Sequence, residues 1–213
     1  MLVVHHLGRS QSERIVWLCE ELGIPYELKH YTRRADNMLS PPELRALHPI
    51  GSAPVITDGA VQIAESGAIM EYVIARHGGG RLALPPEHPD YPNYLYWLHF
   101  ANGSLQPAMG RRMLIGRLQL PPEHPVRAMM EERLDRQLRF LDARLGAATW
   151  LAGEDFTAAD IMMGFPLTTM RHFAPLDLGP YPNILAYLQR IAARPAYARA
   201  MAKGDPGMDL LLT

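Results

Sequence analysis

This chain of 213 residues has little of several features that mark particular classes of protein. Its single cysteine, Cys19, excludes an intrachain disulfide. The net charge is only -1, and just two of the 21 basic residues, Lys29 and Lys203, are lysines. So small an imbalance of charge argues against an electrostatic surface for nucleic acid, and we expect no nucleic-acid partner.

Long apolar runs are also missing. No run approaches the roughly 20 residues that a helix needs to span a bilayer. No basic segment followed by an apolar segment stands at the start, as a signal peptide would require. We therefore expect no membrane partner and a cytoplasmic location. The hydrophobic content of 48% is nevertheless enough for one large core or two small ones.

The pattern of apolar residues changes near residue 78. Before it, strands and helices are predicted in the order β-α-β-α-β-β-α. Their predicted ranges are 2–6, 11–23, 26–30, a short helix from about 40 to 48, 54–57, 61–63 and 65–77. In the short helix, Ser40 is the predicted cap, with a first-turn proline and Glu43 at the capping-box position. This order predicts an α/β domain over residues 1–78.

Residues 79–90 are rich in glycine and proline and are predicted to form a linker. Beyond them, 91–213 read as an all-helical domain. Its helices are predicted over 91–118, 123–146, 157–172 and 181–203, the last broken near Pro195.

The sequence Pro-Pro-Glu-His-Pro occurs twice, at 85–89 and at 121–125. Each copy precedes a predicted helix, where prolines and an acidic residue are favoured. His88 and His124 are weak candidates for zinc ligands, because a metal site needs a fuller ligand set. We expect no metal.

One segment, from Gly51 to Ile69, has an unusual backbone pattern. Pro54 removes a backbone donor at the start of a short β-type run, which favours a special geometry such as a cis Ala53-Pro54 bond. Glu65 and Ser66 then open a helix, where they offer a carboxylate, a hydroxyl and free amides. These groups together suit a peptide-like ligand.

A second candidate group follows the first strand. Ser10 lies just before a predicted helix and has two interpretations. It, or Ser12, is only a helix cap, or Ser10 donates a hydrogen bond to an anion at the helix terminus. A thiol held there would lose its proton below its free pKa of roughly 8.5.

With these segments together, the chain resembles the cytosolic glutathione S-transferases of the bacterial and fungal, theta-like serine type. Ser10 and Arg14, followed by Ile-Val-Trp-Leu-Cys-Glu-Glu-Leu-Gly-Ile-Pro-Tyr-Glu, look like the first loop and helix of that family. Ala53-Pro54-Val with Glu65-Ser66 resembles its glutathione-site signature, and residues 96–104 resemble its fourth helix.

The resemblance implies a thioredoxin-like N-terminal domain, an all-helical C-terminal domain, a homodimer, and glutathione as co-substrate. It implies that Ser10 hydrogen-bonds the glutathione thiolate and that Ala53, beside cis Pro54, binds the cysteinyl unit. Glu65 and Ser66 would bind the γ-glutamyl group. The electrophile would lie between the domains, where Leu7, Met109, Arg112 and Met113 are candidates; the last three, one turn apart on a helix, could instead face core and solvent.

Two positions depart from the family pattern. Ser52 stands where relatives often have the lysine that binds the glycyl carboxylate. His48, Arg33, Arg34 and Arg9 are alternative cations, and the sequence does not choose among them. Asn102 stands where the subgroup often has glutamate, which leaves open whether this position reaches the partner subunit's site.

Other residues have structural interpretations. Thr157 and Asp160 fit a capping box, with Phe156 and Ile161 at the hydrophobic-staple positions. Cys19 lies on an apolar helix face and is predicted to be buried rather than nucleophilic. His5 and His6 are adjacent on a strand and therefore point to opposite faces, which argues against a metal pair.

The leading function is the conjugation of glutathione to small electrophiles, which fits a role in detoxification. Two alternatives remain. The same site can support glutathione-dependent peroxide or disulfide reduction, although no loop cysteine is available for a protein-thiol mechanism. A non-catalytic glutathione-binding or interaction protein on the same scaffold is the third possibility, because fold does not fix function.

Overall fold

The computed structural model describes residues 1–121 and 123–213, and it divides them into two compact units. The first unit contains residues 1–83 and 192–209, and the second contains 84–191 and 210–213. The sequence-based domains, 1–78 and 91–213 with a linker at 79–90, stay a prediction. The compact units differ from them mainly because residues 192–209 group with the first unit. Pro122, in the second Pro-Pro-Glu-His-Pro copy, lies outside the described residues.

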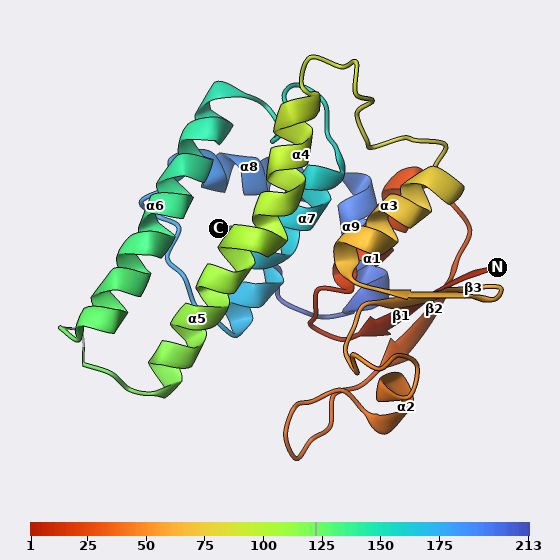
Figure 1. The fold of residues 1–213 in the computed structure, drawn as a ribbon, viewed down its shortest axis with the longest axis horizontal. Coiled ribbons are helices and arrows are strands. Elements are labelled where there is room, and N and C mark those ends of the chain that lie inside the picture. The colour runs from red at the N-terminus through yellow and green to blue at the C-terminus, as the bar shows by residue number, and fades with distance from the viewer. Residues whose placement is uncertain (122) are drawn as a thin grey trace. The chain divides into compact units, whose positions relative to one another are not determined.

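The first unit has the predicted order β-α-β-α-β-β-α around a four-stranded sheet (Figure 1). Its elements are β1 (Leu2–Leu7), α1 (Glu13–Leu22), β2 (Glu27–Tyr31), α2 (Pro42–Arg45), β3 (Val55–Asp58), β4 (Val61–Ala64) and α3 (Ser66–Arg76). The strand order is β2-β1-β3-β4, with β1 parallel to β2 and antiparallel to β3, and β3 antiparallel to β4. This is the predicted thioredoxin-like domain.

The alternation of side chains along β1 assigns its two histidines to opposite faces of the sheet. His5 Nδ1 lies 3.0 Å from the Tyr31 hydroxyl, on the face where Leu7, Tyr31 and Leu44 of α2 form a small core. His6 is completely buried on the other face, where its ring packs against Gly204. The predicted separation of the two rings is therefore confirmed.

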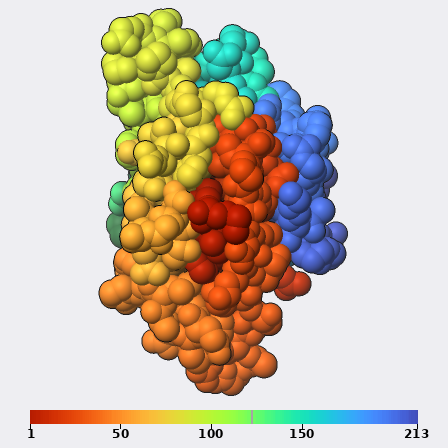
Figure 2. Space-filling model, turned by 90° about the vertical axis from the view of Figure 1, so that its right-hand side faces the viewer, coloured from red at the N-terminus to blue at the C-terminus, as the bar shows by residue number. Residues whose placement is uncertain are grey.

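The last helix, α9 (Pro195–Gly204), packs along α1 within the first unit (Figure 2). Arg194 forms a bidentate ion pair with Glu21, with distances of 2.6 and 2.7 Å. The rings of Trp17 and Tyr197 meet edge to face at 4.8 Å. These contacts explain why a helix that the sequence assigned to the second domain groups with the first.

The second unit is entirely helical, as predicted. Its helices are α4 (Tyr91–Phe100), the π-helical turn η1 (Ala101–Leu105), α5 (Gln106–Arg117), α6 (Pro125–Ala147), α7 (Ala158–Leu167), the 3₁₀ turn η2 (Thr169–His172) and α8 (Pro182–Ala192). The sequence predicted one helix over 91–118, and the structure interrupts it with η1. None of the helices within the described residues is both long and apolar enough to cross a bilayer.

Two predicted helix starts differ from the structure. The sequence pattern placed a cap at Ser40, but α2 begins at Pro42 with Pro41 at the N-cap. Consecutive prolines lock φ at positions 41 and 42, so the first helical turn begins later and Ser40 caps nothing. Helix α1 begins at Glu13 rather than at residue 11, because residues 11 and 12 form a turn.

The predicted capping box is present at the start of α7. The Thr157 side chain accepts from the N–H of Ala159, and Asp160 Oδ2 accepts from the N–H of Thr157 at 2.9 Å. Asp160 Oδ1 also accepts from the Leu151 amide at 3.0 Å and from the Tyr187 hydroxyl at 3.1 Å. Asp160 is therefore a buried residue that joins separate segments of the helical unit through hydrogen bonds.

Candidate functional site

The sheet register brings three separate segments to one edge of the first unit. His5 of β1 pairs with Val55 of β3, and Val55 pairs with Ala64 of β4. The end of β1, the start of β3 and the end of β4 therefore coincide. The loop that carries Ser10 follows the end of β1. The Ala53-Pro54 pair lies just before the start of β3, and the Glu65-Ser66 pair follows the end of β4.

Ser10 lies in the N-terminal loop (residues 8–12), which connects β1 to the start of α1. Its side chain is buried, and its Oγ lies 2.7 Å from Ser12 Oγ and accepts the Ser12 N–H at 3.2 Å. The amides of Glu13 and Arg14 are already bonded to the carbonyls of Ser10 and Gln11. These two amides are therefore occupied, and the role of the Ser10 hydroxyl as the donor to an anion at this terminus stays a prediction.

The helix-cap interpretation does not describe the bonds of Ser12, whereas the bond from the Ser12 N–H to Ser10 Oγ is of the capping kind. Ser12 occupies the N-cap position of α1, but its hydroxyl makes no cap hydrogen bond. It instead accepts the Leu7 N–H at 3.1 Å and lies 2.9 Å from His6 Nδ1. The two hydroxyls therefore belong to a polar chain inside the loop.

Arg14 and Gln11 tie the N-terminal loop to the segment before β3. Arg14 is completely buried, and this burial lowers the pKa of its guanidinium to about 9 although Glu13 acts in the opposite direction. Arg14 Nη1 donates to Gln11 Oε1 at 3.1 Å, and Gln11 Nε2 donates to the Ala53 carbonyl at 3.4 Å. Arg14 thus orients the side chain that links Ser10's loop to Ala53.

The Ala53-Pro54 bond is cis, as expected, and both residues are buried. Glu65 is exposed and has a φ of 73°, a left-handed conformation that non-glycine residues seldom adopt. Ser66 begins α3, and its Oγ is buried without a hydrogen-bond partner among residues 1–121 and 123–213. A buried hydroxyl of this kind calls for a polar partner, and the binding role of Ser66 stays a prediction.

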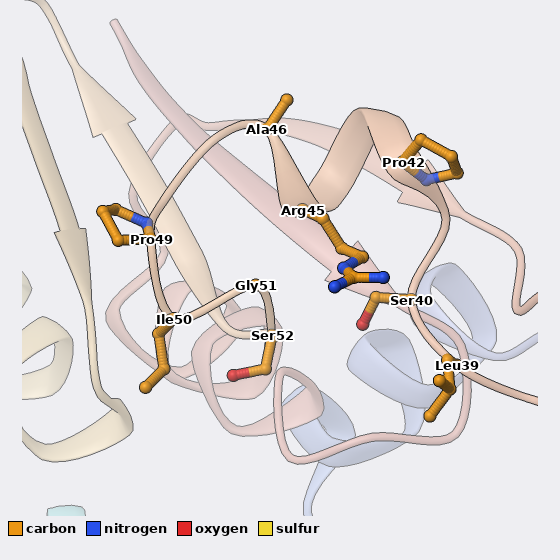
Figure 3. Close-up of a pocket in the computed structure, with 9 residues that line it drawn as sticks. All are labelled: Leu39, Ser40, Pro42, Arg45, Ala46, Pro49, Ile50, Gly51 and Ser52. Carbon is orange, nitrogen blue, oxygen red and sulfur yellow. The ribbon is translucent and has the colours of Figure 1, made fainter.

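A cavity of about 630 Å³ lies next to this edge, beside Ser52 (Figure 3). It is lined by residues from α2 and its flanking loops: Leu39, Ser40, Pro42, Arg45, Ala46, Pro49, Ile50, Gly51 and Ser52. Arg45 extends across it toward Ser40 (Figure 3). Within the described part of the chain, no carboxylate pairs with Arg45.

The structure separates the cations that the sequence left open. Arg33 donates to the backbone carbonyls of Gly8, Arg9 and Met38, so it holds the N-terminal loop. Arg34 pairs with Asp36 at 2.7 Å. Neither lines the cavity beside Ser52.

His48 and Arg9 are not among the lining residues either, and His48 Nδ1 accepts the Ile50 N–H at 3.3 Å. Arg45, which the sequence interpretation did not consider, is the cation that lines the cavity. No local sequence pattern marked Arg45: the φ of +64° at Gly51 favours glycine, but a Cβ there would make only ordinary van der Waals contact with Arg45, 3.6 Å from its Nε.

The predicted electrophile-site residues differ in exposure. Leu7 and Met109 are buried in their own units, with 3% and 0% of their surface exposed. Arg112 and Met113 line a cavity of about 380 Å³ in the second unit. Arg112 pairs with Glu131 at 3.0 Å and donates to the Pro175 carbonyl. The assignment of all four to an electrophile site stays a prediction, and exposure favours Arg112 and Met113.

Cys19 is completely buried, and burial, aided by Glu20, raises the pKa of its thiol to about 12. It is therefore a packing residue, as predicted. His88 and His124 both accept an N–H from two residues further along the chain, at 3.1 and 3.3 Å. In the described ranges no cluster of three or more acidic, histidine or cysteine side chains suits a metal ion.

Two family models match the chain. Residues 1–75 match the glutathione S-transferase N-terminal domain, and residues 107–195 match the glutathione S-transferase C-terminal domain. Glutathione S-transferase 3 of Schizosaccharomyces pombe is 33% identical over 216 residues, which are 95% of this chain and 88% of that protein.

Other relatives extend these findings. A disulfide-bond oxidoreductase of Escherichia coli is 27% identical over 97% of both chains. The crystal structure of a glutathione S-transferase from Actinobacillus pleuropneumoniae superposes with a TM-score of 0.88 at 34% identity. That match covers 98% of this chain and 95% of the other.

Proposed function

Because this chain belongs to the glutathione S-transferase family, we propose that it joins the thiolate of glutathione to small electrophiles at the sheet edge that carries Ser10. The main support for this proposal is that the loop of Ser10, the cis Ala53-Pro54 bond and the Ser66 hydroxyl lie at the same edge of the sheet. Within the described residues, the Ser66 hydroxyl has no hydrogen-bond partner.

The chemistry follows from these groups. The Ser10 hydroxyl donates a hydrogen bond to the thiolate, and the positive end of the α1 dipole favours the negative charge. The backbone of Ala53 binds the cysteinyl unit. Ser66 and Glu65, at the start of α3, bind the γ-glutamyl carboxylate and amino group. Holding the thiolate in place next to the electrophile supplies the remaining acceleration.

In this proposal, Arg45 has the role of the lysine that relatives often have at the position of Ser52. The glycyl carboxylate binds in the cavity beside Ser52, where the Arg45 guanidinium and the hydroxyls of Ser40 and Ser52 supply charge and hydrogen bonds. His48, the predicted alternative, accepts the Ile50 N–H in the turn before Ser52, and a binding role for it stays a prediction.

The test compares acceptors on one preparation of the protein. We expect retention on immobilised glutathione and turnover with an aryl halide well above turnover with an organic peroxide or a mixed disulfide. Retention without any turnover would favour a binding protein, and preferential reduction of the disulfide would favour a reductase.

Disulfide reduction with glutathione alone is the second candidate function. The E. coli relative named as a disulfide-bond oxidoreductase matches over nearly the whole chain. The buried Cys19 thiol, with its raised pKa, cannot serve such a reaction. Any reductase activity would therefore use two glutathione molecules and Ser10, and it would survive a Cys19→Ala substitution.

We also propose that the protein is a cytoplasmic homodimer. The second unit has an exposed aromatic patch, formed by Tyr96, Met129 and Phe140, which are 51%, 54% and 50% exposed. These side chains line a shallow cavity of about 620 Å³ with Arg133 and Arg136. Exposed apolar surface rimmed by polar residues is typical of protein interfaces. In such a dimer, the question left open by the sequence is whether Asn102 reaches the site of the partner subunit.

A further inference from the structure

Four buried side chains of the first unit form a continuous polar chain that ends at Ser10. Asp205 Oδ2 lies 3.2 Å from His6 Nε2, in ion-pair contact rather than in an aligned hydrogen bond. His6 Nδ1 lies 2.9 Å from Ser12 Oγ, and Ser12 Oγ lies 2.7 Å from Ser10 Oγ. His6 and Ser12 are completely buried, and Ser10 is 7% exposed.

Backbone contacts hold the four side chains of this polar chain in place. Arg9 N–H donates to Asp205 Oδ1 at 2.8 Å, which fastens the N-terminal loop to the residue that follows α9. A Cβ on Gly204 would come within 3.3 Å of His6 Nε2, and a Cβ on Gly8 would come within 3.3 Å of Asp205 Oδ1. Both glycines thus allow the imidazole and the carboxylate to approach closely.

Asp205 supplies a negative charge beside His6. Burial would raise the pKa of Asp205, but its contact with His6 and the Arg9 amide bring that pKa below its ordinary value. Asp205 is therefore an anion. Other titratable groups lie nearby. The His30 ring meets the His6 ring edge to face at 5.6 Å, the charge of Asp205 acts to raise the pKa of Arg33, and the charge of Arg9 acts to lower the pKa of Asp205.

We propose that His6, oriented by Asp205, receives the proton of bound glutathione through the hydroxyls of Ser10 and Ser12 and holds it while the thiolate is present. This proposal rests on the proposed function, since it needs a thiol beside Ser10. It assigns His6 and Asp205 as positioning and relay residues, because neither touches the tripeptide.

The number of protons is conserved along this polar chain of side chains. With His6 neutral, the thiol donates to Ser10 Oγ, the Ser10 hydroxyl to Ser12 Oγ, and the Ser12 hydroxyl to His6 Nδ1. When the thiol proton moves to Ser10, Ser10 passes its own proton to Ser12, and Ser12 passes its own to Nδ1. The products are a thiolate that accepts a bond from Ser10 and an imidazolium paired with Asp205. After product release the same hydroxyls return the proton to solvent.

A structural role is the rival explanation, because Asp205 and His6 also fasten the loop. Two readouts separate the roles: the pKa of the bound thiol, followed by the ultraviolet absorbance of the thiolate, and the number of protons released to the buffer for each thiolate formed. A loop that is merely loosened changes affinity for S-methylglutathione, which has no thiol proton. A broken relay leaves that affinity unchanged.

The experiment uses the whole protein and the variants His6→Asn, Asp205→Asn and Ser12→Ala. The matched control is His5→Asn, because His5 is also a buried histidine on β1 with two side-chain partners, Tyr31 and Thr57, but it faces away from Ser10. Thermal unfolding of each variant identifies any that does not fold, and the three relay variants interrupt the chain at separate places.

In the wild type and in His5→Asn we expect fewer than one proton released to the buffer for each thiolate formed, because the relay retains the proton. In His6→Asn we expect one, and in all three relay variants a bound-thiol pKa higher by about one unit, which is about a tenfold lower thiolate fraction below that pKa. Affinity for S-methylglutathione should stay within about twofold of the wild type, well inside the tenfold that corresponds to about 1.4 kcal/mol.

A ratio of one in the wild type, or a bound-thiol pKa that the folded relay variants leave unchanged, would overturn the relay while conjugation through Ser10 stands. If the wild type bound neither glutathione nor S-methylglutathione, the proposed function itself would fail and the relay with it.

Discussion

At the scale of single residues, Arg45 is the side chain on which affinity for the glycyl end of glutathione depends. We expect Arg45→Ala to raise the KM for glutathione with little change in kcat, because the carboxylate is bound equally in ground and transition states. Arg45 is exposed to solvent, so the effect should be about three- to tenfold, in keeping with exposed charge pairs. Steady-state kinetics with an aryl halide measure it.

Two controls test this assignment of Arg45. Arg45→Lys keeps the charge and should recover part of the affinity, although it loses the planar fork of donors. γ-Glutamylcysteine has no glycyl carboxylate, so wild type and Arg45→Ala should use it equally well. A loss as large with γ-glutamylcysteine as with glutathione would show that Arg45 acts elsewhere.

The sequence predicted some site residues and not others, for a physical reason. Ser10, Ala53-Pro54 and Glu65-Ser66 follow from local patterns of turn, proline and helix start, and the structure brings them together, while their binding roles stay a prediction. Arg45 and Asp205 have no such local pattern. Asp205 meets His6 only because α9 returns to pack along α1, a contact between opposite ends of the chain.

At the scale of secondary-structure elements, the start of α7 should matter for stability more than for catalysis. Asp160→Ala leaves the amides of Leu151 and Thr157 and the Tyr187 hydroxyl without their acceptor. We expect the free energy of unfolding to fall by at least about 3 kcal/mol, since each of the three lost buried partners costs about 1–3 kcal/mol. Denaturant titration measures the free energy of unfolding, and an assay of the folded fraction measures its specific activity. Unchanged stability with lost turnover would refute this division.

The same aspartate makes a prediction about pH. Complete burial raises the pKa of Asp160 to about 6, although its hydrogen bonds act to lower it. Because the folded pKa is above the unfolded one, the stability from this carboxyl is present below about pH 4 and is lost as pH rises toward about 6. Asp160→Asn cannot titrate.

The free energy of unfolding of the wild type, relative to Asp160→Asn, should therefore fall between about pH 4 and about pH 6, by an amount on the order of 2–3 kcal/mol. Denaturant titrations of both proteins across this range measure it. A constant difference would show that the pKa of Asp160 is the same in the folded and unfolded states.

Element order was predictable because strand and helix periodicities are local. The interruption of the long helix 91–118 by η1 was not, because a π turn leaves the apolar pattern nearly unchanged. The late start of α2 shows the opposite case, in which a cap signal at Ser40 was overridden by two prolines.

At the scale of the whole molecule, the aromatic patch of Tyr96, Met129 and Phe140 should determine the oligomeric state. Phe140→Glu places a charge in the predicted interface, and we expect a shift from dimer to monomer in sedimentation velocity. Leu118→Glu is the matched control, because Leu118 is 69% exposed and lies outside the patch. A dimer unaffected by Phe140→Glu would place the interface on another surface.

The central claim is that the Ser10 hydroxyl stabilises the glutathione thiolate, and one comparison tests it most directly. It is the kcat for conjugation of glutathione to an aryl halide by the wild type, Ser10→Ala and Ser10→Thr, with the affinity of each for S-methylglutathione. Loss of one donor to a developing or bound anion typically costs about 10²-fold in kcat or more. We expect a fall of about that size in Ser10→Ala, partial recovery in Ser10→Thr, and similar S-methylglutathione affinities. An unchanged kcat in Ser10→Ala would contradict the account.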